Sequence, residues 1–550
     1  MVSILFLDLT MFHSQWFCVE QQRLVMQLKP VETGHDQGSR CMDGTRETIL
    51  ERIMGWVSNL QERNETPQSD TYWVYGSPGV GKTALAHSIC ASLQERRQLA
   101  GAFFCRRDAE NLSDPRNLLP TFIHKLAQTF PHFRTIVAEH LQADPHLTSQ
   151  SMKETLFVDF VRSVHRHPKQ HTLVFVIDAF DECGNRKSRP DILKALIEAA
   201  TLAPWLKIII TSRPEVDIGQ CFLDIPTKYD LGTDGEANSD LRTFARSEFR
   251  SVASQFLLSA WPEESLFNRV ISQANGLFIF IKTLVLALEL CSDPEESLKE
   301  MLQGSISPGL EPLFGLYTGI LKAQLINNNT AKFWQVVALI TTAQYRPLHE
   351  ETIANLARVK ANLVGKWVND LSSLLYRDEG ADNVIRARHL SIIEYFVSDR
   401  CVYKANLQDA HAQLGVSCLD TMVVQLRFNI CELEDSRVAN AAIKDLESRI
   451  EQKIPQPLQY SCLYWSNHLS KAPSSDIWQA LALGSLKKFI EGLSPLFWLE
   501  VLSVLGMVPI GALSLRRIIS WVKVSRALVH LRFAFWCNSN CVKGCQFNAS

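Results

Sequence analysis

The sequence has almost no excess of charge of one sign, because 56 Lys and Arg residues stand against 58 Asp and Glu residues in a chain of 550. The formal net charge of −2 gives no overall attraction to nucleic acid, so we expect no nucleic-acid partner. The 14 cysteines lack the spacing of a disulfide framework, which favours reduced thiols in a cytoplasmic protein. No repeat with a period of about 20 to 50 residues is present, which argues against a repeat array.

Signals for export or membrane insertion are weak. The first residues are apolar but have no basic region, and Asp8 interrupts them, so we expect no cleaved signal peptide. The apolar stretch 496–515 contains Glu500 and Pro509, which favours a buried helix of a helical domain over a membrane span. We therefore expect a soluble protein without a membrane partner.

Apolar runs of strand length alternate with helical patterns between residues 41 and 225. Helical periodicity is clearest in 41–60, 84–100 and 192–200. This alternation is typical of a parallel sheet covered by helices on both faces. The predicted strands are 71–75, 101–105, 171–178 and 208–212.

Strand patterns fade after residue 241, and helical periodicity takes over. Residues 332–398 show three helical segments and then two short extended runs around a polar turn, which is the order of a winged helix. The predicted fold is thus an α/β domain followed by helical and winged-helix domains, mostly α overall. The predicted parts are an N-terminal extension (1–40), the α/β domain (41–225), a helical domain (226–330), a winged helix (331–400), a C-terminal helical domain (401–530) and a disordered tail (531–550).

The most specific motif is GSPGVGKT, which has the form G-x-x-x-x-G-K-[ST] and lies between a predicted strand and a predicted helix. Glycines let the backbone wrap closely around an anion, and the positive end of the following helix faces the same point. We expect Lys82 to reach the β- and γ-phosphates of a nucleotide and Thr83 to coordinate Mg²⁺. The α/β domain is therefore predicted to be a P-loop NTPase. Its predicted nucleotide-binding residues are Gly76, Ser77, Pro78, Gly79, Val80, Gly81, Lys82 and Thr83.

A second set of polar residues follows two of the predicted strands. Asp178 ends the run LVFVID, where a carboxylate can hold Mg²⁺ together with Thr83. Asp181 and Glu182 come next, and one of them is a candidate to polarise the water for hydrolysis; the sequence leaves open which one. Arg213 follows the last predicted strand, where it can sense a γ-phosphate. Solvated loop side chains are the alternative interpretation of these last three residues.

The motifs GSPGVGKTALA, LVFVIDAFDEC and IIITSRPE, in this order, resemble those of a NACHT domain, in the signal-transducing (STAND) branch of P-loop NTPases. Further segments, among them CMDGTRETILERIMGW and ANGLFIFIKTLV, are similar to fungal NACHT proteins over residues 41–525. The resemblance implies a switch that ADP closes and ATP opens, with slow hydrolysis, in intracellular signalling or self/non-self defence such as innate immunity. It also implies self-association on activation and a signalling protein partner. Relatives often carry a repeat array as a sensor, which we expect this sequence to lack.

The resemblance further implies a role for one histidine of the winged helix. In such modules it touches the β-phosphate of ADP, and the matching position here is His389. From the residues alone, an ordinary partly buried histidine explains this position equally well. One such bond supplies about 1.5–3 kcal/mol, whereas moving a switch from 1:99 to 99:1 takes about 5.5 kcal/mol. We therefore expect Mg²⁺, Arg213 and domain contacts to share the task.

Two other functions stay open at this point. One is a scaffold that holds a nucleotide permanently as a structural element. The other is a transcription regulator whose recognition helix would lie within 362–376. That segment offers Lys366 and almost no other cation, and we expect Trp367 to be exposed, so packing is favoured over phosphate contact. The predicted ligands are ATP or ADP with Mg²⁺, and adenine over guanine rests on the resemblance alone.

Overall fold

The structure is a computed structural model, and it divides into two compact units, residues 1–316 and 317–550. The predicted N-terminal extension falls largely, and the predicted disordered tail entirely, outside the described residues. The residues that the structure describes are 21–26, 28, 30–31, 39–58, 70–129, 131–143, 172–203, 205–232, 237–304, 312–324, 331–343, 347–378, 383–401, 407–435, 437–473 and 476–524.

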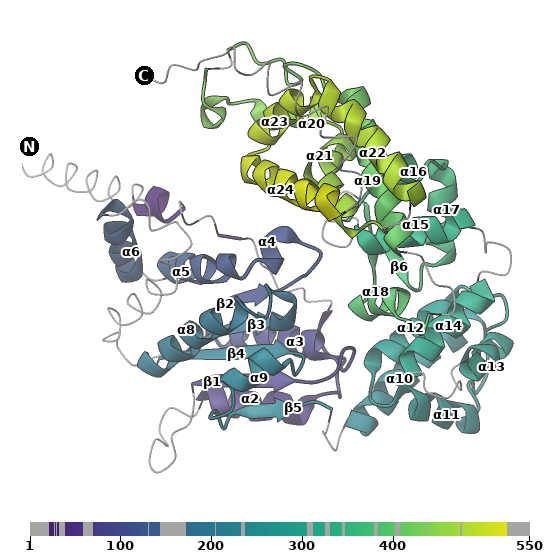
Figure 1. The fold of residues 1–550 in the computed structure, drawn as a ribbon. Helices are drawn as coiled ribbons and strands as arrows, with labels where there is room; N and C mark the ends of the chain where they lie inside the picture. Colours follow the sequence, from purple (N-terminus) through teal and green to yellow (C-terminus); the bar gives the residue numbers. More distant parts are fainter. Residues whose placement is uncertain are drawn as a thin grey trace, which may run out of the picture. The chain divides into compact units, whose positions relative to one another are not determined.

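The first unit is built on a five-stranded parallel sheet (Figure 1). Its order is β2-β3-β4-β1-β5, and every neighbouring pair is parallel. The sequence predicted the first four strands, and it missed the fifth because three residues are too short for a periodic signal. The strands are β1 (Thr71–Tyr75), β2 (Leu99–Phe104), β3 (Leu173–Asp178), β4 (Leu206–Ser212) and β5 (Lys228–Asp230).

Helices cover both faces of the sheet, which explains why every residue of β3 and β4 is buried. Val174 and Val176 face the core formed with α2 and α3, whereas Phe175 and Ile177 face the core formed with α5 and α8. On the second face the rings of Phe122 and Phe175 stack with centroids 3.9 Å apart. The predicted α/β fold is confirmed. The helices are α2 (Glu47–Ser58), α3 (Lys82–Glu95), α4 (Glu110–Ser113), α5 (Leu118–Thr129), α6 (Pro131–Ala143), α8 (Arg189–Leu202) and α9 (Val216–Cys221).

A group of helices follows the sheet in the first unit. The most apolar of them is α12, whose buried residues include Phe280, Ile281 and Leu284. Its amphipathic neighbours α10 and α11 contact it, so α12 can be apolar on most sides. The helices are α10 (Ala237–Gln255), α11 (Glu264–Ala274), α12 (Phe278–Glu289), α13 (Pro294–Gly304) and α14 (Pro312–Gln324), the last of which contains the division between the units.

The second unit begins with three helices and an antiparallel hairpin, in the order that the sequence predicted. Trp367 corrects one expectation, because only 4% of it is exposed and its ring lies 5.6 Å from that of Phe333. The indole belongs to the core between α15 and α17, which leaves Lys366 on the outer face of α17. The elements are α15 (Ala331–Thr342), α16 (Glu350–Ala357), α17 (Ala361–Asp370), β6 (Leu375–Asp378), β7 (Val384–Ala387) and α18 (Leu390–Val397).

The remaining helices form a second bundle around α19 and α21. The apolar stretch 496–515 is not the single buried helix that the sequence predicted, because the chain turns at Gly506 (φ 69°). Leu496 and Leu513 are 62% and 46% exposed, so each of the two helices has an apolar outer side. Among the described residues, no helix combines the length and apolarity that a membrane crossing requires. The helices are α19 (Leu407–Gln425), α20 (Leu446–Lys453), α21 (Gln456–Lys471), α22 (Asp476–Glu491), α23 (Ser494–Val504) and α24 (Val508–Val524).

Candidate functional site

The glycine-rich loop joins β1 to α3 at the carboxyl end of the parallel strands. Gly79 and Gly81 have φ values of 84° and 94°, a backbone region that residues with a side chain rarely adopt. Gly81 is the N-cap of α3, so the loop leads directly into the helix end whose amides carry partial positive charge. The predicted strand–loop–helix arrangement is therefore present.

Helix α12 packs against this loop from within the same unit. The Ile279 amide donates to the Gly79 carbonyl at 3.2 Å. A Cβ built on Gly79 would lie 2.1 Å from Cγ2 of Ile279, and one built on Gly81 would lie 4.0 Å from the Phe278 ring. Gly79 is thus required twice, for its positive φ and for this close approach.

Lys82 is the first residue of α3, and its ammonium group stays at the loop. Nζ donates to the carbonyls of Gly76 at 2.8 Å and Ser77 at 2.9 Å. Burial lowers the pKa of Lys82 to about 8, and the negative charges of Asp181 and Asp178 oppose this shift. The ammonium group therefore lies within the field of the carboxylates that the sequence assigned to the same site.

Thr83 and Asp178, to which the sequence assigns a shared Mg²⁺, are in direct contact. The Thr83 hydroxyl donates to Oδ2 of Asp178 at 2.8 Å, and the Thr211 hydroxyl donates to Oδ1 at 2.5 Å. Burial raises the pKa of Asp178, which is only 2% exposed, and the two hydroxyl donors oppose the rise. A hydroxyl and a carboxylate side by side supply the oxygen ligands that Mg²⁺ prefers.

Asp181 is engaged by Arg213. The Arg213 amide donates to Oδ1 of Asp181 at 2.9 Å, and Nε lies 3.3 Å from Oδ2. Arg189, which is buried, donates from Nη1 to the Asp181 carbonyl at 2.8 Å. Because Asp181 is 6% exposed and paired in this way, its carboxylate holds the Arg213 side chain in place.

Glu182 differs from its neighbour. Its Oε2 accepts a bond from the Arg107 amide at 3.2 Å, and burial raises its pKa to about 7. It ends the short 3₁₀ helix Phe180–Glu182, which begins after Ala179 in a left-handed conformation (φ 51°). A carboxylate with a pKa near neutrality suits proton transfer at neutral pH. The structure thus separates two acids that the sequence could not distinguish.

Sequence reasoning missed several residues at the loop and its supports. Thr211 bonds Asp178 and also accepts from the Ala179 amide at 3.0 Å. Arg46, 3% exposed, donates from Nη2 to the Val80 carbonyl at 3.0 Å, and its own amide donates to Asp240 at 3.1 Å. One indication of these two residues was present in the sequence: both lie in segments that resemble NACHT proteins.

His389 belongs to the second unit, where it is the N-cap of α18. Its Nδ1 accepts from the Ser391 amide at 3.2 Å and lies 2.6 Å from the Ser391 hydroxyl. This local role accounts for a partly buried histidine at the start of a helix. Contact of His389 with a β-phosphate stays a prediction.

Comparisons with known proteins leave the family of this chain open. A family model described as nephrocystin 3, N-terminal, matches residues 44–213, less than a third of the chain. A comparison with curated proteins finds no match. The chain is similar to a Walker-type ATPase of Pyrococcus abyssi (11% identity, TM-score 0.32, 67% of this chain and 99% of that one). It is also similar to Drosophila ORC bound to DNA (14% identity, TM-score 0.29, 68% of this chain and 86% of that one). A third similar structure is Cdc6p from Pyrobaculum aerophilum (10% identity, TM-score 0.30, 66% of this chain and 96% of that one).

The residues present fit a nucleotide with Mg²⁺ by two local tests. Gly79 and Gly81 keep the loop free of side chains at its two tightest points, as close approach of a phosphate requires. Lys82 offers the cation for the phosphates, and the Thr83 hydroxyl beside Asp178 offers the oxygens for the metal. Lys82 and Thr83 follow the loop directly, whereas Asp178 ends β3, 95 residues after Thr83, and the parallel sheet brings them to one edge.

Proposed function

We propose that this protein is a nucleotide-operated switch that binds ATP or ADP with Mg²⁺ and hydrolyses ATP slowly. The observation that carries the proposal is the meeting of Lys82, Thr83 and Asp178 at the carboxyl edge of the parallel sheet. In this proposal the loop from Gly76 to Thr83 holds the phosphates. Mg²⁺, when bound by Thr83 and Asp178, neutralises negative charge on the phosphates.

The protein's own groups then account for hydrolysis. Lys82 binds the β- and γ-phosphates with its ammonium group. Glu182 accepts the proton of the attacking water, because its raised pKa makes it a better base than an ordinary carboxylate. Asp181 orients Arg213 toward the γ-phosphate through the bonds described above.

The same contacts explain why turnover would be slow. Burial favours the protonated form of Glu182, which cannot act as a base. The guanidinium group of Arg213 is partly neutralised by Asp181, which weakens its attraction for a phosphate. Slow hydrolysis suits a switch, because the ATP state must last long enough to act.

The finer parts of the proposal rest on the resemblance to NACHT proteins. They comprise the STAND mode of switching, contact of His389 with ADP, self-association on activation, a signalling protein partner and a role in signalling or defence. The residue pairs in the first unit support nucleotide binding, and they are compatible with each of these parts.

Two substitutions test the proposal. Lys82→Ala is expected to weaken ATP and ADP binding by about ten- to a hundredfold, because charge-assisted bonds of about 1.5–3 kcal/mol are lost. Asp178→Asn is expected to retain nucleotide binding and lose Mg²⁺-dependent phosphate release. The measurements are equilibrium titration with a fluorescent ATP analogue and a phosphate-release assay. Equal nucleotide affinity of the wild type and Lys82→Ala would contradict the proposal.

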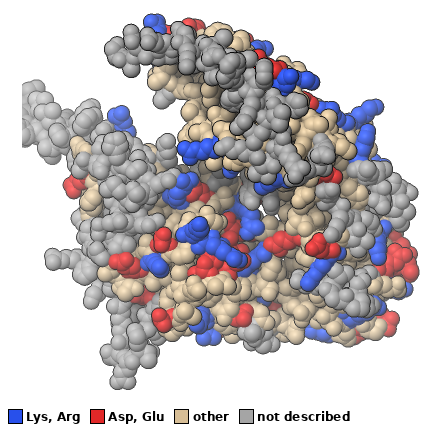
Figure 2. Space-filling model, in the orientation of Figure 1, with Lys and Arg blue, Asp and Glu red and all other residues tan. Residues whose placement is uncertain are grey.

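The nucleotide released from freshly purified protein on denaturation separates the switch from a permanent scaffold. Bound ADP that survives purification and does not exchange, in a protein that releases no phosphate, would favour the scaffold. A winged-helix regulator has less support, because Lys366 is the single basic residue of α17. On the face drawn in Figure 2, Lys and Arg side chains lie among Asp and Glu side chains. Retention on DNA at low salt that Lys366→Glu abolishes would favour that alternative.

A further inference from the structure

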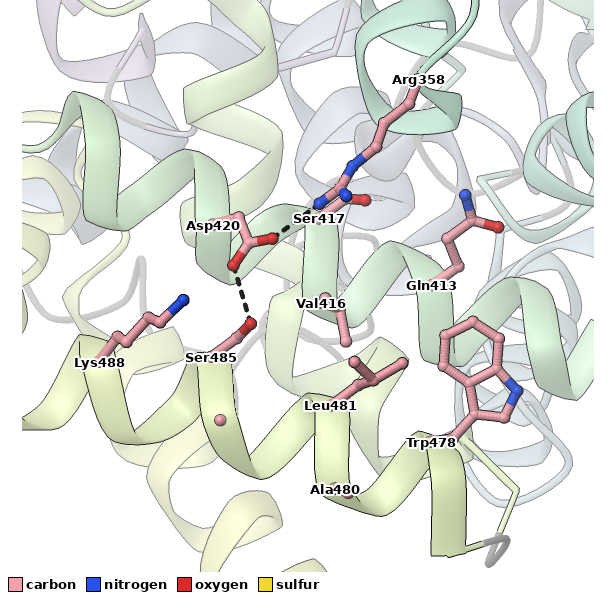
Figure 3. A pocket seen from close by; sticks show the side chains of 11 residues that line it. Arg358, Gln413, Val416, Ser417, Asp420, Trp478, Ala480, Leu481, Ser485 and Lys488 are labelled. Carbon is pink, nitrogen blue, oxygen red and sulfur yellow. Dashed lines mark hydrogen bonds and ion pairs between the residues drawn. The ribbon is translucent and has the colours of Figure 1, made fainter.

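A cavity of about 530 Å³ lies in the second unit, between α19, α22 and the end of α16 (Figure 3). Its volume falls within the range of small-molecule sites, about 300 to 1,000 Å³. The residues that line it belong to the second unit, whereas the glycine-rich loop belongs to the first.

The middle of the cavity is apolar. Val416 of α19 and Leu481 of α22 face one another there, and Trp478 stands at one end (Figure 3). Gly484 adds open space, because a Cβ built on it would meet no atom within 4 Å. A glycine in a helix costs about 1 kcal/mol relative to alanine, and no neighbouring atom in the fold requires it here. An apolar, flat body of ligand size fits this region.

The polar walls are held in place by bonds within the second unit. The Trp478 indole donates to Oδ1 of Asp409 at 2.8 Å, which fixes the ring. Asp420 accepts from Arg358 at 2.7 Å and from Ser485 at 2.8 Å. Because these groups are already bonded to one another, a ligand would meet a preorganised surface and would spend little energy on ordering it.

The charges around the cavity favour a single negative charge. Its ionisable lining residues are Arg358, Asp420 and Lys488, with a combined charge of +1. Asp420 balances Arg358, and within the part of the chain that the structure describes Lys488 has no ion-pair partner. Figure 3 places Lys488 at the end opposite Trp478 and Gln413. A monoanion would balance this charge, whereas a phosphate dianion would leave a negative charge uncompensated.

We propose that this cavity binds a small aromatic monocarboxylate. The aromatic body lies over Val416 and Leu481 toward Trp478, and the carboxylate pairs with Lys488. The Gln413 amide, which has no hydrogen-bond partner among the described residues, is available to a polar substituent at the aromatic end. This assigns the second unit a ligand site of its own, independent of the nucleotide.

The probe for the test is 1-pyrenebutyrate, an aromatic monocarboxylate, with the uncharged alcohol 1-pyrenebutanol as its matched control. Fluorescence anisotropy of each is measured against the full-length protein and its variants. Saturable binding of pyrenebutyrate is expected. Lys488→Gln should weaken it by about three- to fivefold, the effect of one partly exposed ion pair, and should leave pyrenebutanol binding unchanged. The matched variant is Lys487→Gln, because this neighbouring lysine pairs with Glu491 and does not line the cavity.

Two filling variants test the location. Gly484→Phe and Ala480→Trp place a large ring in the cavity from exposed positions of α22, and both should abolish saturable binding. Lys82→Ala should leave binding unchanged, because it alters only the glycine-rich loop. The proposal is overturned if the wild type shows no saturable binding, or if both filling variants bind as the wild type does. Equal weakening by Lys487→Gln and Lys488→Gln, or loss of binding in Lys82→Ala, would overturn it as well.

Discussion

Replacing Glu182 by Gln is expected to stop hydrolysis and, at the same time, to stabilise the protein above neutral pH. The structure supplies the reason, because burial raises the pKa of this carboxyl from 4.5 to about 7. The folded state therefore keeps the proton more tightly than the unfolded chain does. Above about pH 7 the fold must hold a buried negative charge, which glutamine at the same position does not carry.

The sign and size of the stability effect follow from linkage. Between pH 4.5 and about 7 the folded state binds more protons than the unfolded state, so the free energy of unfolding falls as pH rises. A shift of this size corresponds to about 3 kcal/mol once both states are ionised. Below about pH 4.5 both states are protonated and the effect vanishes. Glu182→Gln should therefore match the wild type near pH 4.5 and exceed it by up to about 3 kcal/mol near pH 8.

Two assays measure these outcomes. Phosphate release by the wild type should rise with pH through about 7, reaching at pH 6 about a tenth of its high-pH value, and Glu182→Gln should lose about 10²- to 10⁴-fold in rate while still binding nucleotide. Thermal unfolding followed by tryptophan fluorescence gives the pH-dependent difference in stability. Glu51→Gln, an exposed position on α2, is the matched control. A variant that is less stable than the wild type near pH 8, or one that hydrolyses ATP normally, would refute the assignment of Glu182.

Two further substitutions test the supports of the site. Gly79→Ala should weaken nucleotide binding and destabilise the loop, because it places a Cβ 2.1 Å from Cγ2 of Ile279 at a φ of 84°. Ile279→Ala in the same protein should restore part of the lost affinity. Nucleotide titration of the single and double variants measures this, and fully additive effects of the two substitutions would contradict a direct contact. Thr211→Val should lower stability by about 1–3 kcal/mol, because Asp178 and the Ala179 amide each lose a partner in a buried place, and should reduce Mg²⁺-dependent hydrolysis; unfolding and phosphate release measure the two effects, and an unchanged Thr211→Val protein would show that Asp178 does not need this bond.

The sequence predicted the sheet and the ends of its strands because these depend on local patterns. Runs such as LVFVI, which Asp178 ends, are apolar without alternation, as is typical of strands buried on both faces, and the glycines of GSPGVGKT favour its turn. The sequence did not predict the features that depend on tertiary contacts. β5 was too short to detect, and Trp367 could not be placed without its partner Phe333.

The same division holds for the site. Lys82, Thr83 and Asp178 follow from motif and strand order, because parallel strands end at one edge. The different surroundings of Asp181 and Glu182 do not, because they depend on which arginine or amide lies nearby after folding. Arg46 contacts the loop from about 30 residues before it, and Ile279 from about 200 residues after it. Periodic patterns in a short window cannot predict contacts over such separations.

The contacts around the loop also indicate how the free energy of switching would be distributed. A shift from 1:99 to 99:1 needs about 5.5 kcal/mol, more than one hydrogen bond of His389 supplies. Within the first unit, the loop is bonded to α12 through Ile279 and to the segment before α2 through Arg46, whose amide also bonds Asp240 of α10. Any change in the conformation of the loop on exchange of ADP for ATP must therefore be accommodated by α10 and α12. Several hydrogen bonds of about 1 kcal/mol each, changed together, approach the value of about 5.5 kcal/mol that switching needs. We therefore expect nucleotide exchange to move α10 and α12 before other elements of the first unit.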